Sequence, residues 1–139
     1  MSSQIDKDER LLRRSYYDSN FKQKSDGSVK VQNKLFWPDN RGSNELALSV
    51  DRLTENNEDF LRELAKEEET NRMGDFKGWA LVIAKDAFAS NRSLEHHPLC
   101  ENPFHTHIVL PCQKDEKNCI RFQAQELASK AFPYKIEGL

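Results

Sequence analysis

The sequence lacks long hydrophobic runs and the glycine-rich loops that hold common cofactors. No stretch of its 139 residues approaches the run of about 18 apolar residues that a membrane-spanning helix needs. Residues 1–20 contain no apolar segment of the kind found in a secretory signal. The five glycines are not spaced as in a dinucleotide- or phosphate-binding loop. We therefore expect a cytoplasmic protein with no membrane span, no membrane partner and no glycine-rich nucleotide loop.

Charge is unevenly spread along the chain, but positive charge is not concentrated in any segment. The 21 basic and 23 acidic side chains give a net charge of −2. Residues 1–40 carry 8 basic and 6 acidic side chains, residues 41–75 carry 5 and 10, and residues 76–139 carry 8 and 7. A protein that follows nucleic-acid phosphates needs clustered Lys and Arg side chains. Nucleic acid is therefore not favoured as a partner, whereas a slightly basic N-terminal segment followed by an acidic one favours contacts between protein chains.

Cysteine is scarce, with Cys100, Cys112 and Cys119 as its three positions. An odd number of cysteines without a secretory segment predicts no disulfide framework. Cysteines in a reducing compartment are small buried residues, metal ligands or nucleophiles. The composition alone leaves these three roles open.

Hydrophobic periodicity predicts an α+β fold. Leu, Ile, Val and Phe together make up 32 of 139 residues, which is enough for a modest core. We predict a small mixed or antiparallel sheet of about four strands, packed with two to three helices. Strands are expected over 29–31, 46–50, 79–84 and 105–110, and helices over 56–65, 85–88 and 120–132.

The N-terminal part has less hydrophobic content and is expected to be an arm. Residues 1–27 are predicted as an N-terminal arm with a short helix that begins near Asp6, and residues 28–139 as a single α+β domain. In that helix Leu12 and Tyr16 would share one face. Ser25 to Ser28 predict a turn, because Gly27 tolerates positive φ and Asp26 can bond the nearby backbone. A second turn is expected over 37–42.

Histidine is concentrated in one short segment. All four histidines, His96, His97, His105 and His107, lie within twelve positions, with Cys100 among them. On a strand, His105 and His107 point to the same face, so two imidazoles can meet at one ion. With His97 and Cys100 from the preceding loop, they form a candidate metal site that favours Zn²⁺ over Mg²⁺ or Ca²⁺. The spacing matches no structural zinc motif, and zinc is the one cofactor that the sequence indicates.

Three other interpretations of this segment stay open. In the first, His105 or His107 acts as a general base and Arg52 on another strand neutralises a phosphate, with Ser49 and Asp51 as alternative partners. In the second, Cys100 is a nucleophile beside a histidine. In the third, His105 and His107 form the polar face of a half-buried strand whose other face carries Thr106, Ile108 and Leu110.

Two functions follow from these patterns. The first is a small cytosolic interaction or regulatory module that acts through contacts with a protein partner or through self-association, as a homodimer or larger homo-oligomer. The alternative is a small hydrolase or nuclease, metal-assisted or based on a histidine general base, centred on His105 and His107. Binding of a small molecule without turnover would use the same histidine face.

Overall fold

The computed structural model describes residues 1–39, 45–72 and 74–137. Its helical elements are short except for α1 and α4, and its strands contain three to seven residues. In chain order the elements are β1 (Arg10–Ser15), the 3₁₀ helix η1 (Asp18–Asn20), β2 (Phe21–Gln23), β3 (Val29–Val31), the 3₁₀ helix η2 (Asn33–Phe36), β4 (Ala47–Leu53), α1 (Glu58–Glu67), α2 (Glu69–Arg72), β5 (Gly78–Ile83), α3 (Ala84–Ala87), β6 (Ser93–His96), β7 (His105–Val109), α4 (Lys117–Lys130) and β8 (Phe132–Tyr134).

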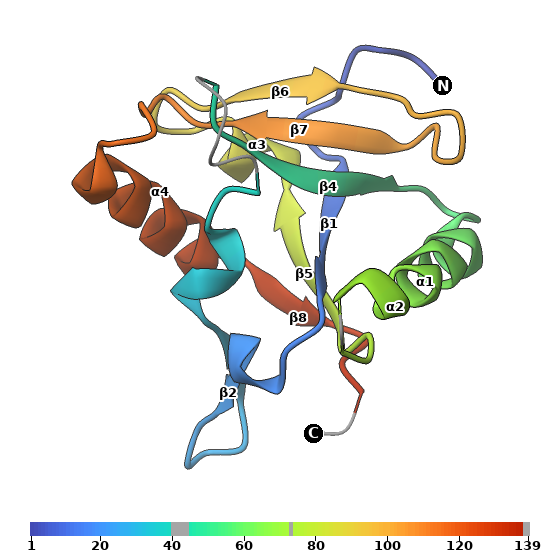
Figure 1. Ribbon diagram of the computed structural model, residues 1–139, viewed down its shortest axis with the longest axis horizontal. Coiled ribbons are helices and arrows are strands. Elements are labelled where there is room, and N and C mark those ends of the chain that lie inside the picture. The colour runs from blue at the N-terminus through green and yellow to red at the C-terminus, as the bar shows by residue number, and fades with distance from the viewer. Residues whose placement is uncertain (40–44, 73, 138–139) are drawn as a thin grey trace.

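Most strands belong to one antiparallel sheet. Its six strands have the order β6-β7-β4-β1-β5-β8, and β2 and β3 pair separately. The inner strand β5 is apolar on both faces, because helices and loops cover the sheet from two sides (Figure 1), whereas β1 combines buried leucines with arginines. Such strands appear as continuous apolar runs in a sequence, as the segment at 79–84 does.

Two hydrophobic clusters hold the layers together. On one face, α4 packs Ile120, Ala124 and Leu127 against buried residues of the inner strands, including Leu11 and Ile108. On the other face, α1 contributes to a second cluster with Leu12, Tyr16, Phe76 and Trp79. Adjacent residues of β1 therefore enter different clusters, as strand alternation requires.

The predicted α+β class is confirmed, and the sheet is antiparallel with more strands than the four expected. The strands expected over 29–31, 46–50, 79–84 and 105–110 and the helices expected over 56–65, 85–88 and 120–132 all have counterparts in the structure. The strands β2, β6 and β8 were not predicted. Of the turn expected over 37–42, residues 40–42 lie outside the described residues.

The short helix predicted for the N-terminal arm is wrong. Arg10–Ser15 is the strand β1, and it lies between β4 and β5 in the main sheet. Leu11 and Leu12 are both fully buried, so residues 10–15 form part of the core and not of an arm. The turn at Ser25 to Ser28 is confirmed, with Gly27 at φ +89° and Asp26 Oδ1 accepting from the Ser28 N–H at 2.9 Å.

Two of the cysteines are joined, which corrects the expectation that they are separate reduced residues. Cys112 and Cys119 form a disulfide that links the segment after β7 to the first turns of α4. Cys100 is a free, exposed thiol. No helix within the described ranges is both long and apolar enough to cross a membrane.

Candidate functional site

The site begins where two inner strands separate. β1 pairs with β4 from Arg10↔Leu53 to Leu12↔Asp51, and beyond this point β1 pairs only with β5 in the described sheet, while β4 continues with β7. Arg13 fills the gap and donates to the Ser49 carbonyl oxygen at 3.0 Å. An opening on one face of the sheet follows from this separation.

Arg13 holds the opening with all five of its guanidinium N–H groups. Nε donates to the Leu35 carbonyl, and the two terminal nitrogens donate to the Trp37 and Ser49 carbonyls and to both oxygens of Asp39, at 2.7 and 2.9 Å. Burial acts to raise the pKa of Asp39, but Arg13 and the Ser49 N–H outweigh it, so the pKa of this carboxyl lies below its usual value. Arg13 therefore has a structural role and has no donor left for a ligand.

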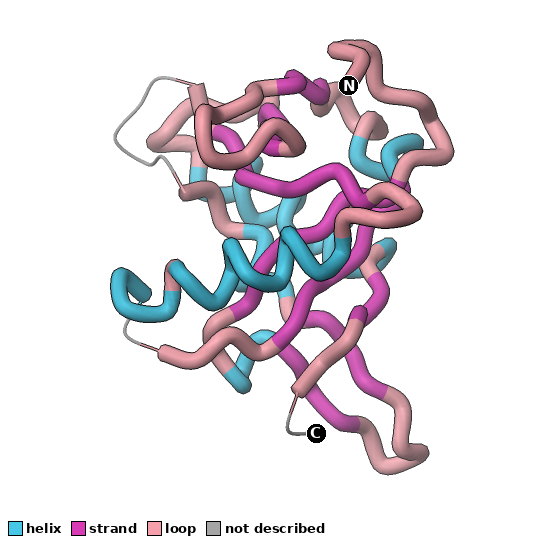
Figure 2. Tube along the Cα trace, turned by 90° about the vertical axis from the view of Figure 1, so that its right-hand side faces the viewer, coloured by secondary structure: helices cyan, strands magenta, loops and turns pink. Residues whose placement is uncertain are grey.

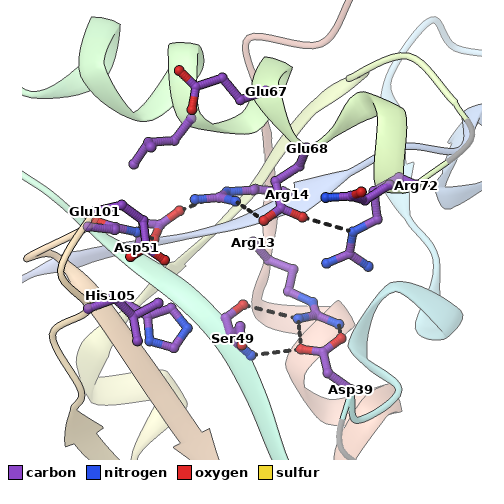
Figure 3. A pocket seen from close by; sticks show the side chains of 14 residues that line it. Arg13, Arg14, Asp39, Ser49, Asp51, Glu67, Glu68, Arg72, Glu101 and His105 are labelled. Atoms are coloured by element: carbon purple, nitrogen blue, oxygen red, sulfur yellow. Dashed lines mark hydrogen bonds and ion pairs between the residues drawn. The ribbon is translucent and has the colours of Figure 1, made fainter.

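A polar cleft of about 350 Å³ lies over this opening. Charged side chains of both signs line it, and Figure 3 shows Arg13 joined to Asp39 and Ser49 on one side and Glu68 placed between Arg14 and Arg72 on the other. The walls come from β1, β4, α1, α2 and the loop that leads into β7. The lining residues are Arg13, Arg14, Asp39, Ser49, Asp51, Leu64, Glu67, Glu68, Asn71, Arg72, Leu99, Glu101, Asn102 and His105.

Asp51 is the buried carboxylate of the cleft, with a relative exposure of 2%. Its Oδ2 accepts from Arg14 Nε at 3.1 Å, and its Oδ1 accepts from the Asn102 side-chain amide at 2.7 Å. A buried carboxylate is stable only when charged or hydrogen-bonding partners compensate it. Asp51 therefore fixes the loop that contains Asn102 to the centre of the sheet, and this loop connects the two halves of the histidine segment.

Three of the four histidines meet at the rim of the cleft. The rings of His97 and His107 stack with centroids 4.4 Å apart, and the His105 ring lies 4.9 Å from that of His107 and 5.5 Å from that of His97. One ring nitrogen from each lies within 4.8 Å of the other two. Nitrogens bound to a single tetrahedral zinc ion lie roughly 3.4 Å apart, so the stacked rings of His97 and His107 would have to turn toward a common point to bind one ion. The three histidines could thus hold a metal ion.

Strand pairing explains how the rings meet. His105 and His107 are two residues apart on β7 and share its cleft-facing side, where they pair with Asp51 and Ser49 of β4. His97 lies directly after β6, the neighbour of β7, and its N–H donates to the His105 carbonyl at 2.9 Å. The antiparallel pairing of β6 with β7 therefore brings His97 back to the histidines that follow it in the sequence.

The hydrogen bonding of His105 prepares it as a ligand. Its Nδ1 lies 2.9 Å from the His97 carbonyl oxygen, which can only accept, so Nδ1 carries the proton. In the neutral ring the lone pair is then on Nε2, which is free for a metal ion. A backbone carbonyl that fixes the tautomer in this way is the usual outer partner of a metal-binding histidine.

The environment of His107 favours its neutral form. Burial lowers the pKa of its imidazole, and the neighbouring His105 and His97 lower it further, while Asp39 and Glu45 act in the opposite direction. A histidine binds metal only when the coordinating nitrogen is deprotonated. His107 is therefore biased toward the form that binds an ion.

The structure separates the predicted site residues into two groups. His97, His105 and His107 are together, but Cys100 is exposed and does not belong to the group of side chains that could hold an ion. Arg52 lies on the other face of β4, where it bonds Glu9. The proposed pairing of Arg52 with His105 and His107 is therefore wrong, because adjacent residues of a strand point in opposite directions.

Most residues of the cleft were not predicted from the sequence. Arg14 takes the position that the prediction assigned to Arg52, on the same side as His105, while Asp39 and Asn102 come from loops. Alternation along β4 already separates Ser49 and Asp51 from Arg52, and this signal could have selected the correct pair. Nothing local could place Asn102 beside Asp51, because 51 positions separate them.

The fold and the site together define an antiparallel α+β protein that has a polar cleft and a histidine cluster at its rim. No protein-family model matches the sequence, and neither a curated protein nor a solved structure matches the chain.

Proposed function

We propose that this protein is a metal-assisted hydrolase in which His97, His105 and His107 hold a divalent transition-metal ion. The observation that supports this most directly is the meeting of three ring nitrogens within 4.8 Å at the rim of a cleft. Imidazole ligands suit zinc, copper, iron and nickel and do not suit magnesium or calcium. Zinc fits the ligand set and is the ion that we propose.

Three protein ligands support a catalytic ion better than a structural one. Structural zinc sites are closed by four protein ligands, whereas catalytic sites have three and keep one position for water or substrate. In such a site the ion supplies Lewis acidity and lowers the pKa of bound water to about 7. Because His105 lines the cleft, the open position would be accessible to a molecule bound there.

The remaining residues of the cleft have positioning roles in this proposal. Asp51 orients Arg14, whose terminal nitrogens extend toward Glu68 and carry donors beyond those that the Asp51 bond uses. A guanidinium in this position can hold a phosphate or carboxylate group of a substrate. Asn102 is fixed by Asp51 and keeps the loop that contains Glu101 against the cleft. A phosphoester or a carboxylic ester of small size fits these groups.

The first experiment measures metal binding by untagged protein that has been stripped with a chelator. Titration calorimetry with zinc and elemental analysis should give one equivalent per chain. His107→Ala should weaken binding at least 100-fold, since it removes a ligand. His96→Ala is the matched control, because the His96 ring lies on the opposite face of the sheet and contacts Arg52. Absence of binding, or an equal loss in both variants, would contradict the metal site.

The second experiment tests hydrolysis by the metal-loaded protein. The substrates are bis(p-nitrophenyl) phosphate and p-nitrophenyl acetate, which separate phosphodiester from ester chemistry. We expect turnover that requires the ion and is lost in His107→Ala but kept in His96→Ala. Stoichiometric zinc without turnover of either substrate would assign a structural ion and overturn the hydrolase proposal.

A protein–protein interaction module remains a second candidate. It is favoured by exposed aromatic side chains on several elements, and the most exposed, Tyr17 and Phe132, each have 59% of their surface accessible. Light scattering over a concentration series tests self-association, and a pull-down from the native lysate tests for a partner. A protein that stays monomeric and recovers no partner would argue against this role.

A further inference from the structure

The hairpin formed by β2 and β3 is separate from the main sheet and projects from the body of the protein. It is a two-stranded sheet of its own and extends at the lower end of the molecule in both views (Figures 1 and 2). Its turn closes with the Gly27 N–H donating to the Lys24 carbonyl at 3.0 Å and the Lys24 N–H donating to the Ser28 carbonyl at 2.7 Å. The positive φ of Gly27 is the conformation that this three-residue loop requires.

The two faces of the hairpin have different chemistry. Phe21 and Val31 are opposite each other, and both are buried in the core cluster. Lys22 and Lys30 are also opposite each other, and because residues directly opposite in an antiparallel pair share a face, both lysines lie on the outer side. Lys24 is two residues from Lys22 and follows the same side. One face therefore anchors the hairpin, and the other presents three lysines.

One carboxylate, that of Asp26, acts on this lysine face, through its charge near Lys24. The one acid of the loop, Asp26, accepts from the N–H and the hydroxyl of Ser28, at 2.9 and 2.6 Å. Within the described ranges, Lys22, Lys24 and Lys30 make no ion pair. Like charges placed directly opposite on a hairpin are destabilising, and a short hairpin has little stability of its own. An anionic partner would remove this repulsion.

We propose that the lysine face of the hairpin, Lys22, Lys24 and Lys30, binds the phosphate backbone of a nucleic acid. Neighbouring lysines on one strand face lie roughly 6.8 Å apart, which is twice the rise per strand residue. Phosphates along one DNA strand are separated by a rise of about 3.4 Å. These ammonium groups can therefore reach nearby phosphates of one backbone. Lysine contacts to phosphate carry no base information, so binding is independent of sequence.

An anionic membrane is a less suitable partner for this surface. Proteins that lie on membranes combine basic residues with apolar side chains that enter the lipid. The tip of this hairpin contains Ser25, Asp26, Gly27 and Ser28, none of which has a large apolar side chain. The proposed role of the lysine face does not depend on the proposed metal site, and it would hold even if that site catalysed no reaction.

The three lysines do not form a basic cluster in the linear sequence, which is why the sequence did not favour a nucleic-acid partner. The three lysines are spread over nine positions and alternate with apolar or polar residues, so no basic run is visible. The hairpin register collects them on one surface.

The test compares two triple variants in fluorescence anisotropy with labelled 20-nucleotide DNA, single-stranded and duplex, of two unrelated sequences. The first is Lys22→Gln, Lys24→Gln, Lys30→Gln. Wild type should bind all DNAs at 50 mM salt, and the hairpin variant should bind at least 10-fold more weakly. The slope of log K against log salt should decrease in magnitude by about 2 to 3, since each phosphate contact contributes about 0.9 for duplex DNA.

The second variant is the matched control Lys85→Gln, Lys114→Gln, Lys130→Gln, which changes the net charge equally at exposed positions elsewhere. It should bind within 2-fold of wild type with an unchanged slope. Circular dichroism and thermal unfolding of the hairpin variant should show a fold at least as stable as wild type, because the repulsion is removed. Equal losses in the two variants, or no DNA binding by wild type, would overturn the proposal, as would tighter binding to vesicles that contain phosphatidylserine than to DNA.

Discussion

Two polar clusters lie on opposite faces of the sheet where β4 pairs with β7, and their hydrogen bonding differs. On one face, Arg52 is 3% exposed and uses all five guanidinium N–H groups. Two of them bond the Glu9 carboxylate at 2.7 Å, and the others bond the Ser2 and Gln4 carbonyls and His96 Nδ1. Burial acts to raise the pKa of Glu9, but the bonds from Arg52 and from the Asp6 N–H, together with the positive charge of Arg52, outweigh it and the pKa is lowered.

On the other face, most ring nitrogens of His97, His105 and His107 make no hydrogen bond to residues 1–39, 45–72 and 74–137. Of these six ring nitrogens, one, His105 Nδ1, is hydrogen-bonded to another residue within the described part of the chain. A polar cluster whose donors and acceptors are all paired stabilises a fold, whereas one that keeps free ligand atoms at a cleft can bind something. The comparison therefore supports a stabilising role for the Arg52 cluster and agrees with the binding role that we propose for the histidine cluster.

The largest expected effect is on the Arg52 side. Arg52→Met should lower the free energy of unfolding by about 3 kcal/mol, because it leaves the Glu9 carboxylate and two backbone carbonyls without their donor. Urea unfolding at pH 7 measures this. Arg121→Met, at an exposed position on α4, should change it by less than about 0.5 kcal/mol. Arg52→Met protein should retain its zinc affinity under conditions in which it is folded, and a loss of affinity would show that the two clusters are not independent.

The second effect is on the histidine side and depends on the ion. Zinc at 100 times its dissociation constant should raise the free energy of unfolding of wild type by about 2.7 kcal/mol, since the ion binds the folded state. His105→Ala should abolish this increase and change the stability of the metal-free protein much less than Arg52→Met does. His96→Gln should keep the increase. Thermal unfolding of wild type, His105→Ala and His96→Gln, each with zinc and with a chelator, measures these changes. An increase in stability with zinc that His105→Ala retains would contradict the assignment of His105 as a ligand.

The parts of this comparison that could be predicted from sequence are those decided by local geometry. Alternation along 105–110 placed His105 and His107 on one face, and the chemistry of Asp26 and Gly27 located the turn between β2 and β3, although β2 itself was not predicted. Both depend on residues at most four positions apart, so no distant partner is needed to derive them.

The parts that failed depend on distant partners. β1 was expected to be helical because Leu12 and Tyr16 also fit a helix face. The strand is instead decided by burial on both sides and by the partners of its arginines, since Arg14 bonds Asp51 across 37 positions. Arg52 was proposed as catalytic because its charge is suited to phosphate, whereas its actual partners are His96 and three of the first nine residues, Ser2, Gln4 and Glu9.

The smallest expected effect concerns the saturated arginine of the cleft, Arg13. Asp39→Asn should lower the free energy of unfolding at pH 7 by about 1 kcal/mol, because the ion pair with Arg13 is lost. The effect is small for two reasons. Asn still accepts hydrogen bonds, and 32% of the Asp39 side chain is exposed to solvent that screens the charge. Asp18→Asn is the control, since Asp18 is 78% exposed and its ion pair with Lys77 is long.

The same variant has a predicted pH signature. The pKa of Asp39 is lower in the folded state, so below its usual value of about 3.8 the unfolded state binds the proton first. The stabilisation is therefore fully present above that pH and is lost as the pH falls through the folded-state pKa. Urea unfolding from pH 5 to pH 2 should show a weaker acid sensitivity in Asp39→Asn than in wild type or Asp18→Asn. If the free energy of unfolding of Asp39→Asn depended on pH as strongly as that of wild type, Arg13 would be held by its backbone carbonyl partners alone. The cleft wall would then not depend on Asp39, just as the histidine cluster is expected not to depend on Arg52.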